Sequence, residues 1–88
     1  MPNIKRLHLA QFEIEQELWR ASLESPKFNT PHEGYAVIKK RLDELWEDIK
    51  ANRAKGTMRR EAKQVAAMAL RFMLDLCEEE EGGEEKPK

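Results

Sequence analysis

The stretch from residue 65 to residue 77 constrains the fold more than any other part of this 88-residue chain. It contains no glycine or proline, and its only charged side chains are Arg71 and Asp75. Apolar residues therefore surround most of the circumference of a helix formed by this segment. Because such a helix is normally covered on more than one side, we predict a helix over residues 58–79 that other helices enclose.

Two further helices are expected before it. Asn3 is a candidate N-cap for a helix over residues 4–23, which should stop before Ser25 and Pro26 because proline disfavours helix in the residue that precedes it. Thr30 and Glu33 have the spacing of a capping box, with Pro31 at the first helical position. The next helix should therefore start at residue 31.

The second predicted helix carries an apolar stripe at helical spacing, formed by Tyr35, Ile38, Leu42, Leu45 and Ile49. We expect this helix to end near residues 53–55. Gly56 would then occupy a left-handed C-terminal position, and Thr57 would cap the third helix.

These elements make the chain all-α, a small bundle of about three helices in a single domain over residues 1–77. A chain this short has a marginal core of its own, and a large exposed apolar patch usually marks an interface. We therefore expect a homo-oligomer, most simply a homodimer that sandwiches the third helix.

The charge of the chain is divided between a body and a tail. From Asp75 onward there are seven acids and two bases, so this end carries −5, whereas the first 74 residues hold 14 bases and 10 acids and carry +4. Residues 78–88 should form a disordered acidic tail. The basic body could bind an anionic ligand, or the charges could simply be solvated.

Two sequence features bear on the cellular setting. No apolar run approaches the roughly 20 residues needed to span a bilayer, and the N-terminal residues do not resemble a signal peptide. Cys77 is the only cysteine, which favours a reducing cytoplasm. We expect its thiol to be buried and inert.

A second stripe on the middle helix is charged, and it includes Glu33, Lys40, Arg41, Glu44 and Asp48. Carboxylates three or four residues apart on helices can hold Mg²⁺, which prefers oxygen ligands. By itself this pattern is only weak support for a metal site, because charged helix faces are usually solvated.

Three segments in order, HEGYAVI from His32, LDELW from Leu42 and EAKQVAAMALRF from Glu61, resemble MazG-like proteins of phages and bacteria over roughly residues 30–75. The resemblance implies an all-α, oligomeric protein. Active members of that family use Mg²⁺ to cleave nucleoside triphosphates to monophosphate and pyrophosphate.

The family's metal motif is E-E-x-x-E followed by E-x-x-D, and this chain departs from it. Lys40 and Arg41 stand where the first two glutamates are expected, and Gln64 stands where the aspartate is expected. Glu44 and Glu61 remain as two of the four implied metal ligands. Arginine stays charged in proteins, so the resemblance implies a weakened Mg²⁺ site.

The position of Arg41 leaves two alternatives. Its guanidinium could replace the metal by pairing with Glu44 or Glu61, or it could point to solvent. A strict hairpin that turns at Gly56 does not place Glu44 opposite Glu61, because Glu44 lies about 12 residues, near 18 Å, before the turn and Glu61 only about five after it. The two could meet only through a longer connection, an offset of the helices, or a dimer.

We favour a non-catalytic or weakly active MazG-like protein that binds a nucleotide or a protein partner. An active Mg²⁺-dependent pyrophosphohydrolase is the first alternative, with Glu33 or Asp48 as substitute ligands. Trp46 should be a core or groove residue, or could stack on a base, and His32 should lie on the surface. Nucleic-acid binding through the basic residues of segment 50–63 is the least favoured, because aromatic residues are not interleaved there.

Overall fold

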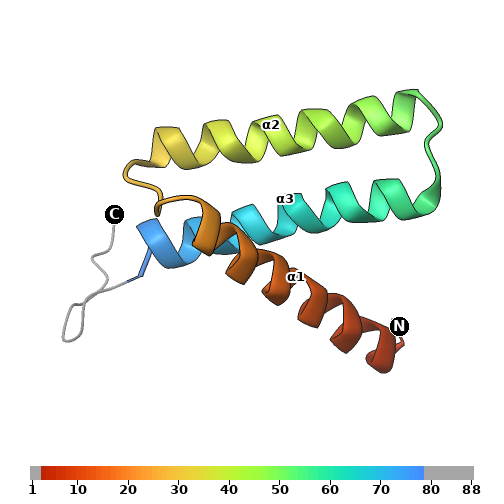
Figure 1. Ribbon diagram of the computed structural model, residues 1–88, viewed down its shortest axis with the longest axis horizontal. Helices are drawn as coiled ribbons and strands as arrows, with labels where there is room; N and C mark the ends of the chain where they lie inside the picture. Colours follow the sequence, from red (N-terminus) through yellow and green to blue (C-terminus); the bar gives the residue numbers. More distant parts are fainter. Residues whose placement is uncertain (1–2, 79–88) are drawn as a thin grey trace, which may run out of the picture.

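A computed structural model describes residues 3–78, and it consists of three helices (Figure 1): α1 (Ile4–Glu24), α2 (Pro31–Lys50) and α3 (Lys55–Leu76). α1 and α2 each pack against α3 and do not pack against each other. The described residues contain no β-strand. The prediction of an all-α bundle of three helices is confirmed. Apart from Glu78, the predicted acidic tail lies outside the described residues.

The first two helices begin where their capping residues predict. The Asn3 side chain accepts hydrogen bonds from the backbone N–H groups of Lys5 and Arg6, at 3.0 and 3.2 Å. Thr30 Oγ1 accepts from the Glu33 N–H at 3.1 Å, while Glu33 Oε1 accepts from the Asn29 N–H at 2.6 Å. The capping box therefore fixes both the start of α2 and the loop that enters it.

The turn between α2 and α3 comes earlier than predicted. α2 ends at Lys50, and the left-handed conformation predicted for Gly56 is taken instead by Asn52 (φ 54°). The Arg53 N–H donates to the Asp48 carbonyl and the Asn52 N–H to the Ile49 carbonyl, at 3.0 and 3.1 Å. This is the hydrogen-bond pattern of a Schellman motif, in which asparagine can replace glycine.

The start of α3 is likewise earlier than expected. The helix begins at Lys55 after Ala54, whose side chain makes no capping hydrogen bond. Gly56 and Thr57 therefore lie inside the first turn of α3, and the prediction that Thr57 is the cap is wrong. The cause is the Schellman motif at Asn52, which leaves only residues 51–54 to connect the two helices.

The core lies around the middle of α3. Phe28, Ala67 and Met68 are buried, and partly buried apolar side chains from all three helices pack against them. Gly34 lets α2 approach α3 closely, since a Cβ atom at this position would lie 2.5 Å from Cδ2 of Phe72. α1 and α2 of the same chain thus cover α3, although Met73 and Leu74 stay exposed. The predicted homodimer is not needed to sandwich this helix.

Several apolar side chains face outward instead. On α2, Tyr35, Leu42 and Ile49 are exposed, whereas Ile38 and Leu45 are half-buried. Trp46 is exposed as well, so it is not a core residue. The apolar stripe of α2 therefore lies along the side of the contact with α3 and not at its centre.

Two smaller expectations concern individual surface positions. Cys77 is exposed, and the prediction of a buried thiol is wrong because α3 ends at Leu76, so that Cys77 is its C-cap and not part of the packed helix. His32 is exposed, as expected. Within residues 3–78, no helix has both the length and the apolar character required to cross a membrane.

Candidate functional site between the second and third helices

The candidate site is a row of half-buried polar side chains between α2 and α3, which we call the polar seam. It consists of Arg41, Glu44 and Asp48 from α2, and Glu61 and Gln64 from α3. On α2 these side chains follow one another at spacings of three and four residues, so they occupy one face of the helix. That face holds three of the five members of the charged stripe seen in the sequence, and it lies against α3.

The early turn brings the two remaining candidate carboxylates to the same level. Glu44 lies six residues before the end of α2 at Lys50, and Glu61 lies six residues after the start of α3 at Lys55. The expectation that a simple hairpin keeps them apart is therefore wrong. It placed the turn at Gly56, whereas the connection is centred between Asn52 and Arg53.

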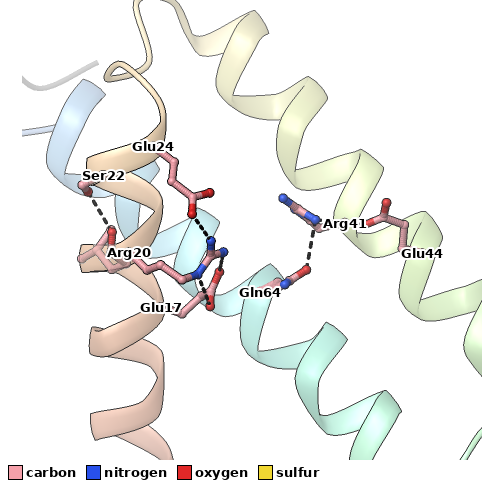
Figure 2. A network of polar contacts seen from close by, with 8 residues as sticks. Glu17, Arg20, Ser22, Glu24, Arg41, Glu44 and Gln64 are labelled. Atoms are coloured by element: carbon pink, nitrogen blue, oxygen red, sulfur yellow. Dashed lines mark hydrogen bonds and ion pairs between the residues drawn. The ribbon is translucent and has the colours of Figure 1, made fainter.

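Arg41 crosses the seam. Its Nη1 atom donates to Gln64 Oε1 at 3.0 Å and to Glu44 Oε1 at 3.3 Å. Figure 2 shows Arg41 and Gln64 reaching toward each other from α2 and α3. About a third of the Arg41 side chain is exposed (34%). The guanidinium therefore lies at the helix interface and does not extend into solvent.

Two carboxylate oxygens of the seam have no protein partner. Asp48 Oδ2 and Glu61 Oε2 are buried and accept no hydrogen bond in the described part of the chain. A buried charged oxygen without a partner costs free energy. Arg41 thus satisfies Glu44 and Gln64, but Asp48 and Glu61 remain incompletely satisfied.

The seam does not fit the Mg²⁺ site that the resemblance implies. Oxygen donors are present, but the Arg41 guanidinium already contacts Glu44, and a fixed cation repels a second one. Among residues 3–78, no group of three or more His, Cys, Asp or Glu side chains is arranged to hold a metal ion. The oxygen donors as folded are therefore too dispersed for a metal ion, and Glu44 is already paired with a cation.

The other predicted site residues lie away from the seam. Lys40 is exposed on α2 and borders a shallow groove with Tyr35 and Asp43. The carboxylate of Glu33 serves the N-terminal cap of α2. Trp46 is exposed, with the Lys50 ammonium 5.6 Å from its ring centroid. Of the three residues predicted as substitute ligands or as a stacking surface, Glu33, Trp46 and Asp48, only Asp48 belongs to the seam.

A cavity of about 190 Å³ opens beside Arg41, where α1, the loop after it, α2 and α3 meet. Glu17 lines it and is almost fully buried (8% exposed). Arg20 bonds to both Glu17 and Glu24 (Figure 2), and these hydrogen bonds raise the pKa of Arg20. The charged side chains that line the cavity are three arginines and three glutamates, namely Arg20, Arg41, Arg71, Glu17, Glu24 and Glu33. Their charges balance, so the cavity has no excess positive charge to attract a phosphate group.

The sequence did not reveal the role of Arg71. This side chain is buried (4% exposed) and donates through Nη2 to the carbonyls of Ser25 and Pro26, both at 2.7 Å. Its Nε donates to Asp75 Oδ2 at 3.3 Å, and the same oxygen accepts from the Phe28 N–H at 2.9 Å. The available signal was the isolated Arg71–Asp75 pair, four residues apart in an otherwise apolar stretch.

We call this group the Arg71 cluster: Arg71, Asp75, Phe28 and the carbonyls of Ser25 and Pro26. The guanidinium also lies 5.1 Å from the Phe28 ring centroid, in the range of a cation–π contact. The cluster ties the loop between α1 and α2 to the C-terminal half of α3. It thereby fixes where α2 starts, and so the register of the seam.

No protein-family model, curated protein or solved structure matches the chain in comparisons with known proteins. The function has to be inferred from the seam and from the surfaces around it.

Proposed function

We propose that this protein is a MazG-like, homo-oligomeric binding protein that does not hydrolyse nucleoside triphosphates efficiently. Arg41 carries the proposal, because it occupies a position where the family motif places a metal-binding glutamate. Its contacts with Glu44 and Gln64, at 3.3 and 3.0 Å, join two further positions of the same motif. In this proposal the guanidinium takes the place of the metal ion.

Electrostatics support this substitution. A unit positive charge 4 Å from a divalent cation raises the energy by about 8 kcal/mol at an effective dielectric constant of 20, before screening by solvent. Arginine cannot relieve the repulsion by losing its proton. Gln64 adds no negative charge either. Binding Mg²⁺ in the family's geometry would require Arg41 to leave the seam.

The surfaces of the chain favour a protein partner over a nucleotide. The cavity beside Arg41 has balanced charge, whereas many large apolar side chains on α1 and α2 are exposed. Exposed apolar surface on this scale usually marks a protein interface. A homo-oligomer would cover it, and a lone thiol with no second cysteine in the chain suits a cytoplasmic setting.

One observation favours the alternative of an active enzyme. Within residues 3–78, Asp48 Oδ2 and Glu61 Oε2 are buried without a partner, and cations would compensate their charges. An active enzyme would require Arg41 to move out and Glu44, Asp48 and Glu61 to draw together, since they are not grouped to hold a metal ion as folded. Nucleic-acid binding gains less support, because two of the basic side chains in segment 50–63, Lys50 and Arg59, are already paired with Glu47 and Glu13.

Pyrophosphate release separates these functions. The protein is incubated with a panel of ribo- and deoxyribonucleoside triphosphates and Mg²⁺, beside the Glu44→Ala and Glu61→Ala variants. We expect no turnover above background. Turnover that both variants abolish would establish the enzyme and overturn the proposal. Without turnover, thermal stabilisation by a nucleotide would identify nucleotide binding, and a steeply salt-dependent DNA complex would point to the third function.

The metal question is tested by titration calorimetry with Mg²⁺ and Mn²⁺. The wild-type chain should show no micromolar binding, because Arg41 occupies the seam. The Arg41→Glu variant restores one acid of the motif and should bind Mg²⁺ more tightly than the wild type does. An Arg41→Gln variant is the control, since it removes the cation without adding a ligand. Micromolar binding by the wild type would contradict the substitution by Arg41.

A further inference from the structure

α1 has a second apolar stripe that the fold leaves uncovered. Leu9, Phe12, Trp19 and Leu23 are 53–87% exposed. With Gln16 they follow one another at steps of three, four, three and four residues. This is the spacing of the a and d positions of a coiled-coil heptad, with Leu9, Gln16 and Leu23 at a, and Phe12 and Trp19 at d.

The opposite face of α1 makes the contact with α3. Ile14 and Ala21 pack against the core cluster, and Glu17 is buried. In the heptad, Ile14 and Ala21 occupy f positions and Glu17 a b position. These positions lie on the side of α1 opposite the a and d residues. Figure 1 shows α1 crossing α3, with its N-terminal end apart from the α2–α3 hairpin. Within residues 3–78, the outer face meets another element at its edge, where Trp19 of α1 and Leu74 of α3 line a small pocket.

We propose that the outer face of α1 pairs with the same face of α1 in a second copy of this chain, in parallel and in register. This inference deepens the homo-oligomer in the proposed function by assigning its interface, and it does not depend on whether the polar seam binds a metal or a nucleotide. The pairing makes α1 the shared centre of two bundles, with each α3 on the outside.

The exposed area approaches that of a specific dimer. From the exposed fractions and total side-chain areas of roughly 150–250 Å², the four apolar residues offer about 500 Å² per copy. Flanking side chains add to this on both copies. A stable interface buries about 800 Å² per partner, which the apolar stripe and its flanks together approach.

The charges beside the stripe are complementary between parallel copies. Glu15 lies at a g position, and Arg20 lies five residues later at an e position, where parallel coiled coils form g–e′ salt bridges between copies. Arg20 contacts Glu17 and Glu24 through three N–H groups, and guanidinium has five. Its remaining donors can therefore reach the other copy's Glu15 without breaking the contacts within α1.

The polar residue within the stripe also favours this register. In a parallel pair, Gln16 lies opposite Gln16 of the other copy, and the two amides can hydrogen-bond to each other. An antiparallel pair instead places Gln16 near Trp19, where the amide has no matching partner. A single polar a position is known to select register in this way.

α2 is the competing surface. Its exposed apolar residues, Tyr35, Leu42, Trp46 and Ile49, are 45–62% exposed. However, the intervening Ile38 and Leu45 are half-buried and Ile38 already packs against the core. On α1, by contrast, every apolar a and d position from Leu9 to Leu23 is more than half exposed. The α1 stripe is therefore the more complete unpaired interface.

Analytical ultracentrifugation of the full chain tests the assignment. We expect the wild type to sediment as a dimer, and Trp19→Glu to weaken dimerisation by at least 100-fold, because it places two carboxylates in the apolar interface. The matched control Trp46→Glu makes the same change on α2 and should remain dimeric. Far-UV circular dichroism checks that both variants keep the helical content of the wild type.

The outcomes separate this inference from the proposed function. A dimer that survives Trp19→Glu, or that Trp46→Glu also dissociates, overturns the assignment to α1 and leaves a homo-oligomer in place. A monomeric wild type at 200 µM overturns both the α1 pairing and the homo-oligomer. Neither result bears on Arg41, which the pyrophosphate and calorimetry experiments test.

Disulfide trapping tests the parallel register and does not depend on the Trp19 variant being folded. In a Cys77→Ser background, Gln16→Cys should cross-link two copies under mild oxidation, because parallel a positions lie side by side. Gln11→Cys makes the same change on the same helix away from the stripe, and it should not cross-link. Absence of the Gln16 cross-link, or equal cross-linking at both positions, would overturn the parallel pairing.

Discussion

Arg71 and Arg41 both reach between elements of this bundle, but their surroundings differ. Arg71 is buried, and its donors meet two backbone carbonyls and the Asp75 carboxylate. Arg41 is one-third exposed and shares a single nitrogen between Glu44 and Gln64. The Arg71 guanidinium is thus hydrogen-bonded to both neutral carbonyls and a negative carboxylate. The polar seam instead keeps two acidic oxygens, on Asp48 and Glu61, that have no partner among residues 3–78.

This difference indicates which charges hold the fold together and which are available to a ligand. Removing one member of a buried, hydrogen-bonded charge network is costly, because its partners are left without compensation. Half-exposed pairs contribute little, since water competes for both groups. The Arg71 cluster should therefore determine stability, and the seam should determine what the protein binds. Replacing single cations by methionine, which keeps length but removes charge, measures this contrast.

The largest effect is expected for Arg71→Met. It leaves the carbonyls of Ser25 and Pro26 without the Arg71 donor and leaves the Asp75 carboxylate without its cation, so the loop that leads into α2 is held less firmly. Urea unfolding followed by circular dichroism should show a loss of about 3–5 kcal/mol. Arg71→Lys keeps the charge but only part of the hydrogen-bond geometry, so it should lose less. A loss below about 1 kcal/mol for Arg71→Met would contradict the role given to the cluster.

A smaller effect is expected for Arg41→Met. It removes the only cation of the polar seam and leaves Glu44, Asp48 and Glu61 facing one interface. Because Arg41 is partly exposed, solvent screening should limit the loss to about 1 kcal/mol in the same urea experiment. The loss should shrink at 1 M salt, which screens repulsion among the remaining acids. A loss equal to that of Arg71→Met would remove the distinction between the two regions.

The capping and apolar patterns of the sequence were sufficient to predict the three helices. Asn3 and Thr30 mark helix starts through their own side chains, and those signals are local. The turn after α2 was misplaced because Asn52, rather than Gly56, adopts the left-handed conformation. Glycine is the residue that most often adopts this conformation, but asparagine tolerates it as well. The hydrogen bonds from the Asn52 and Arg53 N–H groups to the end of α2 place the left-handed residue at Asn52.

The candidate site was harder to predict, because it depends on that turn. A shift of the turn by a few residues changes which side chains face each other across a helical hairpin, and it brings Glu44 level with Glu61. The orientation of the Arg41 side chain also depends on its hydrogen bond to Gln64, which lies 23 residues away in the sequence. The Arg71 cluster needs carbonyls from a loop more than 40 residues distant, and sequence spacing says nothing about these contacts.

Glu61→Gln tests whether the unpartnered oxygens of the seam cost stability. The amide keeps the size of the carboxylate but removes its charge, and one oxygen of that carboxylate, Oε2, is buried without a partner among residues 3–78. We expect a gain of about 0.5–1 kcal/mol at pH 7, because a neutral polar group is less costly to bury than a charged one. Glu47→Gln, on the exposed side of α2, should change nothing measurable. A loss of stability for Glu61→Gln would mean that a group in solution, such as a bound cation, already satisfies this carboxylate.

The smallest effect is expected for Lys39→Met, which calibrates the other changes. Lys39 is exposed and contacts Asp43 at 2.9 Å, and the hydrogen bond to Asp43 raises the pKa of Lys39. A cation whose pKa is raised by folding stabilises the native state below its ordinary pKa, and this contribution is lost as the pH rises through the raised value. At pH 7 it is therefore fully present, yet solvent screens it, so unfolding of the wild type and of Lys39→Met should coincide. If Lys39→Met were as destabilising as Arg41→Met, the loss at Arg41 would reflect helical charge pairs in general, and the polar seam would have no special electrostatic character.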